Sequence, residues 1–252
     1  MARGKRTTMG GADENFEATH WSEIIRVRTD DAEQRRQLLA DVLGRYWKPV
    51  YCYLRRKGYA NEPAKDLVQG FFQEVVLARG LIERADPERG KFRTFLLTAL
   101  DRYATSVHRR ETARKRRPVD GVVSLDGLEG PVAEPSMDAT PEQAFHHAWA
   151  SALLQQVLET VEQLCHENGQ DAHWAVFCAR VVKPTMENAE APSLRQLCEE
   201  LGISDEVRAS NMIVTTKRRF QHVLKRQVRQ FVASDAEVDG EIRSLIEILS
   251  KK

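Results

Sequence analysis

SLRQLCEELGISDEVRASNMIVTTKRRF, residues 193–220, is the stretch of the sequence that predicts its fold most clearly. Ser193 stands where a helix N-cap is expected, ahead of apolar residues at helical spacing, and Gly202 can adopt the left-handed conformation that ends a helix. Ser204 is the expected N-cap of a second helix, with Asp205 and Glu206 at its positive end. Two helices joined by a glycine turn are typical of a helix-turn-helix motif.

The second of these helices predicts one apolar and one polar face. The residues expected to face inward are Val207, Val214, Phe220, Leu224, Val228 and Phe231. The residues expected to face outward are Arg208, Asn211, Met212, Thr215, Lys217 and Arg218. Early outward residues would contact base edges in a major groove, and later cations would contact phosphates. The alternative is a plain hairpin of two helices whose basic residues only face solvent.

Helical periodicity continues through most of the chain, and no segment alternates with period two for long enough to form a sheet. The fold class is therefore all-α. Pro49 is expected to kink or break its helix. The expected helices span residues 21–29, 31–57, 62–79, 91–117, 142–167, 171–182, 193–201, 204–232 and 236–249.

Clustered proline and glycine residues between 119 and 142 predict two small helical domains joined by an acidic, flexible linker. Residues 1–18 are polar and aperiodic, which favours a disordered tail. The expected domains span residues 19–118 and 143–232, the linker spans 119–142, and a helical extension spans 233–252.

The formal charge of +1 is unevenly distributed. Two segments, 102–117 and 217–229, are strongly basic, whereas the linker contains acids and no Lys or Arg. Clustered cations neutralise phosphates, so two basic regions on one polyanion are one interpretation. Three solvated surfaces are the alternative.

Targeting and metal signals are weak. No run of about 18 apolar residues and no signal-peptide pattern occurs, so we expect a cytoplasmic protein without membrane insertion. The four cysteines have no paired spacing, which favours buried thiols. Cys165, His166, His173 and Cys178 lack the spacing of a zinc motif, and no metal or other cofactor is expected.

The helix containing AKDLVQGFFQEVV, residues 64–76, has two different sides. One side is an apolar stripe of Ala64, Leu67, Val68, Phe71, Val75 and Ala78, with Phe72 at its margin. The other mixes Asp66, Gln69, Gly70 and Gln73 with Val76 and Leu77. Such a mixed side suits docking to a protein, although ordinary helical bundles also contain such sides.

The next helix has aromatic residues and ends in the basic run HRRETARKRR, residues 108–117. The loop before it contains Arg84, Arg89 and Lys91. Cations and aromatic rings together suit single-stranded DNA, whose bases stack on the rings. The residues expected to face inward on this helix are Phe92, Phe95, Leu96, Ala99, Tyr103 and Val107. The alternative to a DNA contact is that Phe92 and Phe95 serve only in the core.

Five features of the sequence occur in the order that is typical of one family. They are RYWKPVYCYLRRKGY, DLVQGFF, DPERGKFRTFLLTAL, the acidic linker and the LGIS turn. Across residues 19–232 the chain resembles the extracytoplasmic-function sigma factors of bacterial RNA polymerase. The tail VASDAEVDGEIRSLIEIL is similar to the endings of planctomycete-type members.

The resemblance implies a non-catalytic initiation subunit with three contact regions. Candidates for binding the core polymerase, through its β′ and β subunits, are Glu62, Asp66, Leu67, Gln69, Phe72 and Gln73. Candidates for the minus-ten promoter element are Arg89, Lys91, Arg93, Arg102, Arg109 and Arg110. Those for the minus-thirty-five element are Arg208, Asn211, Met212, Thr215, Lys217 and Arg218. Three kinds of regulation are left open: an anti-sigma factor, a kinase, or control by a fused tail.

The sequence departs from the family pattern at three places. Pro63 and Lys65 stand where acids usually precede DLVQ, so docking on the polymerase is expected to be weaker. Arg102 replaces a common asparagine near the flipped-base pocket. The second helix of the helix-turn-helix needs one extra residue to align.

Two other classes of function are alternatives. A helix-turn-helix regulator with a ligand-sensing or dimerising N-terminal domain leaves the DLVQ helix and the linker unexplained. A recombinase or nuclease would need a catalytic cluster, and no serine, tyrosine or carboxylate arrangement of that kind is recognisable.

Overall fold

The computed structural model describes residues 32–82, 84–86, 91–114, 139–229, 232 and 234–250. These residues form helices and no strand, which confirms the all-α class. The predicted tail 1–18, the helix 21–29 and most of the linker 119–142 lie outside the described residues.

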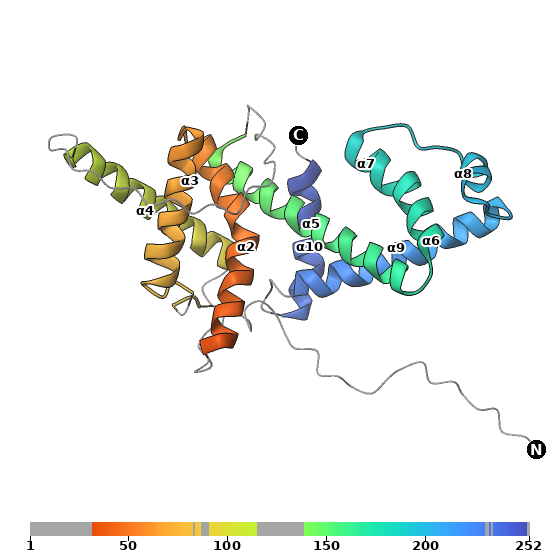
Figure 1. Cartoon of the computed structure of the whole chain (residues 1–252), viewed down its shortest axis with the longest axis horizontal. Coiled ribbons are helices and arrows are strands. Elements are labelled where there is room, and N and C mark those ends of the chain that lie inside the picture. Colours follow the sequence, from red (N-terminus) through yellow and green to blue (C-terminus); the bar gives the residue numbers. More distant parts are fainter. Residues whose placement is uncertain are drawn as a thin grey trace, which may run out of the picture.

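The helices divide between the two ends of an elongated molecule (Figure 1). One end contains α2 (Ala32–Arg56), α3 (Asn61–Gly70), the π-helix η1 (Phe71–Leu77) and α4 (Phe92–Arg114). The other contains α6 (Asp171–Phe177), η3 (Cys178–Val182), α7 (Lys183–Glu187) and α8 (Leu194–Leu201). The long helices α5 (Pro141–Glu167) and α9 (Glu206–Arg229) connect them, followed by η4 (Asp235–Glu237) and α10 (Val238–Ser250).

The main hydrophobic core crosses the predicted boundary between residues 118 and 143. On α2, Tyr46 stacks on Phe145 of α5, with the ring centroids 6.4 Å apart, and meets Phe92 of α4 edge-on. Val228 of α9 and Leu245 of α10 belong to the same cluster. The two segments share a core in this structure, and the finer division into two linked domains stays a prediction.

The helix α2 continues unbroken through Pro49 to Arg56. Proline removes one backbone hydrogen bond, a cost that normally interrupts a helix. Here Val50 and Leu54 on the same helix are completely buried. Burial of these side chains against α5 and its neighbours offsets the lost hydrogen bond, because each contributes about 1.5 to 3 kcal/mol.

The α8–α9 segment follows most of the predicted signals. Ser193 and Gln196 form a reciprocal capping box, and Gly202 ends α8 with a φ of 64°. The expectation that Ser204 caps the next helix was wrong. The carboxylate of Asp205, directly before α9, accepts the backbone N–H of Arg208 at 2.8 Å. This hydrogen bond lowers the pKa of Asp205, so the cap is an anion at the positive helix end.

Candidate nucleic-acid interface

A cleft of about 740 Å³ opens between η1, the turn that follows it, and α4. Its lining is basic and partly aromatic. The cations are Arg79, Arg84, Lys91, Arg102 and Arg110, and the rings belong to Phe95 and Tyr103. Its volume lies within the range of about 300 to 1,000 Å³ that is usual for ligand sites.

The two aromatic rings differ in their surroundings. Phe95 is 36% exposed, so the expectation that it faces the core was wrong. Tyr103 is buried, and its hydroxyl donates to Glu74 Oε1 at 3.4 Å. Burial, together with the charge of Glu74, raises the pKa of Tyr103 to about 12. The phenol therefore stays neutral at physiological pH and adds no negative charge to the cleft.

Gly70 explains how α3 and α4 approach each other beside this cleft. A Cβ atom built at position 70 would overlap the hydroxyl of Tyr103. The ring of Tyr103 also lies against Phe71, with the centroids 5.8 Å apart. The glycine in the DLVQGFF segment is therefore required by close packing at the cleft wall.

The residues predicted to contact the minus-ten element are only partly brought together. Lys91, Arg102 and Arg110 line the cleft, and Arg109 lines an adjoining shallow hollow along α4. Arg93 does not: its side chain is buried against Trp149 of α5, so its placement at this surface was wrong. Arg89 lies outside the described residues.

Other cleft residues were missed as candidates. Arg79 follows the DLVQGFF helix by only two residues, and its position in a turn gave no sequence signal. Phe95 is the fourth residue of α4, and helical spacing from Phe92 suggested a common apolar face. The physical reason for the error is the open groove beside η1, where none of the helices in the described part of the chain covers this side of α4.

The proposed docking face of α3 and η1 is narrower than predicted. Glu62, Asp66 and Gln73 are exposed and Gln69 is half-buried. Glu62 pairs with Lys65, their charged atoms 3.4 Å apart. These side chains provide a polar surface on which the predicted cation at position 65 is partly neutralised.

Leu67 and Phe72 are buried in the core, so their placement on a contact surface was wrong. Leu67 lies in the regular helix α3, on the apolar stripe predicted there. For Phe72 the cause is the π-helix η1, whose hydrogen bonds run from residue i+5 to residue i, as from Ala78 N to Gln73 O at 3.0 Å. The wider turn brings Phe72 and Val76 inward and leaves Ala78 exposed. An α-helical period therefore assigns the wrong residues to the core after Gly70.

The exposed face of α9 contains five of the six residues predicted there: Arg208, Asn211, Thr215, Lys217 and Arg218. Met212 is buried, whereas Val207 and Val214 are 71% and 44% exposed, so these three assignments were wrong. Thr216 takes an inward position instead. Its hydroxyl donates to the backbone oxygen of Met212 at 3.0 Å, which allows a polar residue in the core.

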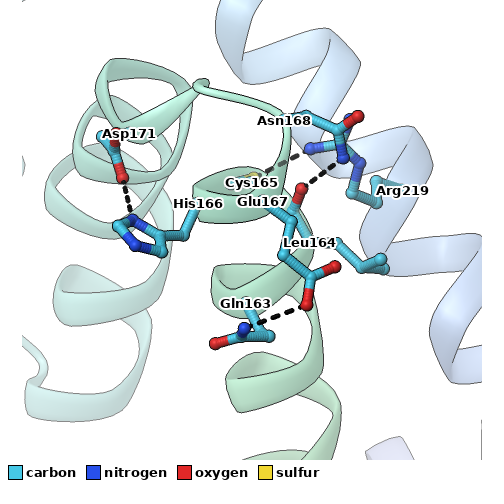
Figure 2. A network of polar contacts seen from close by, with 8 residues as sticks. All are labelled: Gln163, Leu164, Cys165, His166, Glu167, Asn168, Asp171 and Arg219. Atoms are coloured by element: carbon cyan, nitrogen blue, oxygen red, sulfur yellow. Dashed lines mark hydrogen bonds and ion pairs between the residues drawn. The ribbon is translucent and has the colours of Figure 1, made fainter.

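Several cations of the basic segment 217–229 are already engaged within the protein. Arg219 donates to Cys165 Sγ at 2.9 Å and to Gln170 Oε1 at 2.7 Å. Figure 2 shows the first of these bonds beside the ion pair of His166 with Asp171 at the end of α5. Lys225 and Arg229 pair with Asp239 and Asp235 of the C-terminal segment.

The cysteines are reduced, with Cys52 and Cys165 buried and Cys178 and Cys198 half-buried. Within the part of the chain that the structure describes, no three His, Cys, Asp or Glu side chains are grouped to hold a metal ion. None of the described helices has the length and apolar character needed to cross a membrane.

Comparisons with known proteins add no further assignment to this geometry. A scan against protein-family models finds no match, and searches of curated proteins and of solved structures find none either.

Proposed function

We propose that the chain is an alternative sigma factor, which binds bacterial RNA polymerase core and directs promoter recognition. The observation that carries the proposal is the cleft between η1 and α4, whose lining contains five cations, one acid (Asp86) and two aromatic side chains. The proposal also rests on the family resemblance of residues 19–232.

The cleft has the chemistry expected of a site for melted promoter DNA. The exposed ring of Phe95 offers a stacking surface for an unpaired base, and stacking contributes about 1 to 3 kcal/mol per base. Arg102 and Arg110 would contact the phosphates on either side. A volume of about 740 Å³ is within the range of about 300 to 1,000 Å³ that is usual for ligand sites.

The exposed face of α9 would read the upstream promoter element in duplex form. Arg208 and Asn211 are exposed near its N-terminal end, where side chains of a recognition helix reach base edges. Val207 and Val214 extend this face with apolar surface, which suits contact with thymine methyl groups. Lys217 and Arg218 follow them as phosphate ligands.

The surface of α3 and η1 would bind the polymerase. Asp66 and Gln73 are exposed there, and Leu77 adds an apolar side chain that is 43% exposed. A mixture of acid, amide and apolar surface is suited to a protein partner that presents cations.

Reconstitution with bacterial core polymerase tests the proposal. The full chain should form a complex by size-exclusion chromatography and should support transcription from a matched promoter. Arg102→Gln combined with Arg110→Gln should reduce opening of the promoter while the complex still forms. Arg243→Gln, an equal change of side chain on the exposed side of α10, should have no effect.

Two results would contradict this function. A folded chain that forms no complex and supports no transcription from any member of a promoter library is not a sigma factor. Tight sequence-specific binding of duplex DNA without polymerase, combined with no complex, would favour the helix-turn-helix regulator instead.

A further inference from the structure

The C-terminal segment places a buried carboxylate on cations at the edge of the cleft. The side chain of Glu241, on α10, is only 2% exposed. Its carboxylate accepts hydrogen bonds from Lys91 Nζ at 2.5 Å and from Arg93 Nη1. The guanidinium of Arg93 in turn lies 4.5 Å from the ring centroid of Trp149 on α5.

The buried carboxylate of Glu241 is stable only while both of its cationic partners are present. A buried carboxylate is costly unless it is paired and hydrogen-bonded. Burial raises the pKa of Glu241, but hydrogen bonding and the charges of Arg93 and Lys91 outweigh that effect and lower it. Glu241 is therefore an anion at neutral pH, held between two cations.

Two more acids of the same segment contact the basic segment 217–229. Asp239 lies 3.0 Å from Lys225, and Asp235 pairs with Arg229. These pairs are exposed and individually weak. The pattern matters more than their strength, since residues 235–241 place acids both on Lys91 of the cleft and on the basic segment 217–229.

We propose that residues 234–250 are an intramolecular competitor of nucleic acid, in which Glu241 occupies the Lys91 cation that a DNA phosphate would otherwise contact. The proposal rests on the proposed function for the identity of the competing ligand. Its immediate consequence is a chain whose affinity for single-stranded DNA is lowered by its own C-terminal helix.

Lys91 is the residue that couples DNA binding in the cleft to docking of α10. It lines the cleft and also donates to Glu241. A phosphate bound at Lys91 and the Glu241 carboxylate would repel each other across one ammonium group, so occupancy of the cleft and docking of α10 oppose each other. The apolar residues Val238 and Leu245 hold α10 in the core in the absence of DNA.

The test measures binding of a fluorescein-labelled oligo-dT to the full chain by fluorescence anisotropy at several salt concentrations. Glu241→Gln should raise the affinity about threefold to tenfold, as expected when one more cation, Lys91, binds phosphate. The slope of log K against log salt should steepen by about 0.7 for each further phosphate that a cation neutralises. Glu247→Gln removes the same charge from the exposed side of α10 and should change neither quantity.

Lys91→Gln supplies the second arm. It should lower the affinity more in the Glu241→Gln background than in the unaltered chain, where Glu241 already engages the lysine. A third measurement requires no substitution: oligo-dT should accelerate hydrogen exchange of α10 amides in the unaltered chain.

The outcomes separate this proposal from the function on which it rests. Equal affinity and salt slope for the unaltered chain and Glu241→Gln, or unchanged exchange of α10 on DNA binding, would overturn the competitor alone. If no variant binds DNA, either alone or in complex with polymerase, both proposals would be overturned.

Discussion

The backbone of Gly70 packs so tightly against the Tyr103 hydroxyl that position 70 has no room for a side chain. Replacing Gly70 with Ala adds helix propensity of about 1 kcal/mol. The added methyl group overlaps the buried Tyr103 hydroxyl, and overpacking of this kind costs about 1 to 3 kcal/mol. We therefore expect Gly70→Ala to lower the free energy of unfolding, measured by urea denaturation.

The same substitution should change sign when the obstructing atom is absent. In a Tyr103→Phe background, Gly70→Ala is expected to be neutral or stabilising. The hydroxyl oxygen is the atom of Tyr103 that overlaps the new Cβ atom, and the next nearest ring atom is 3.4 Å away. An equal loss of stability in both backgrounds would mean that the strain lies in the backbone and not at Tyr103.

His166 and Asp171 form an exposed ion pair across the turn between α5 and α6, with 2.8 Å between the Nδ1 and Oδ1 atoms (Figure 2). The hydrogen bond and charge of Asp171 raise the pKa of His166 above its ordinary value of 6.5. The stabilising effect is complete below the unfolded pKa and is lost as pH rises through the folded one. Asp171→Asn should therefore lower the His166 pKa measured by NMR titration. A His166 pKa that does not respond to Asp171→Asn would show that the pair is not formed in solution.

At the scale of elements, α9 shows why apolar identity alone misassigns a helix face. Val207 and Val214 are as apolar as Met212, yet the helix exposes the valines and buries the methionine. The buried ridge is set by the packing of Ala209, Met212 and Thr216 against α6 and α8.

Substitutions of buried and of exposed apolar residues on α9 should have different effects on stability and on DNA binding. Met212→Ala should cost about 2 to 5 kcal/mol of unfolding free energy, because it leaves a cavity. Val214→Ala should leave stability nearly unchanged and weaken binding of the upstream promoter element by the polymerase complex. A large loss of stability from Val214→Ala, or none from Met212→Ala, would reverse the assigned faces.

At the scale of the whole molecule, the shared core predicts that the two halves of the chain stay together without the connecting peptide. A protease site inserted between residues 118 and 139 should give two fragments that co-elute in size-exclusion chromatography. The apolar contacts of Tyr46 with Phe145 and Phe92 support this association. Phe145→Ala should weaken it, since truncating a buried phenylalanine costs about 3 to 5 kcal/mol.

A matched substitution on the surface controls for handling of the cut protein. Gln155→Ala changes an exposed residue of the same helix and should leave the fragments associated. Separation of the unaltered fragments at low micromolar concentration would contradict a shared core in solution.

Most helix positions could be predicted from the sequence, because caps, glycine turns and apolar periodicity are local signals. The capping box at Ser193, the turn at Gly202 and the uninterrupted helical series are of this kind. Candidate cations such as Arg102 and Arg110 could also be found, since long basic side chains on a helix are exposed in most packings.

Tertiary structure alone decided which of those residues meet. The π-helix after Gly70 moved Phe72 and Val76 into the core, and the open groove beside η1 left Phe95 exposed. Glu241 binds Arg93 from 148 positions away in the chain, and no local pattern encodes such a pair. Helical period and capping follow from neighbours in sequence, whereas burial and charge pairing follow from which distant elements pack together.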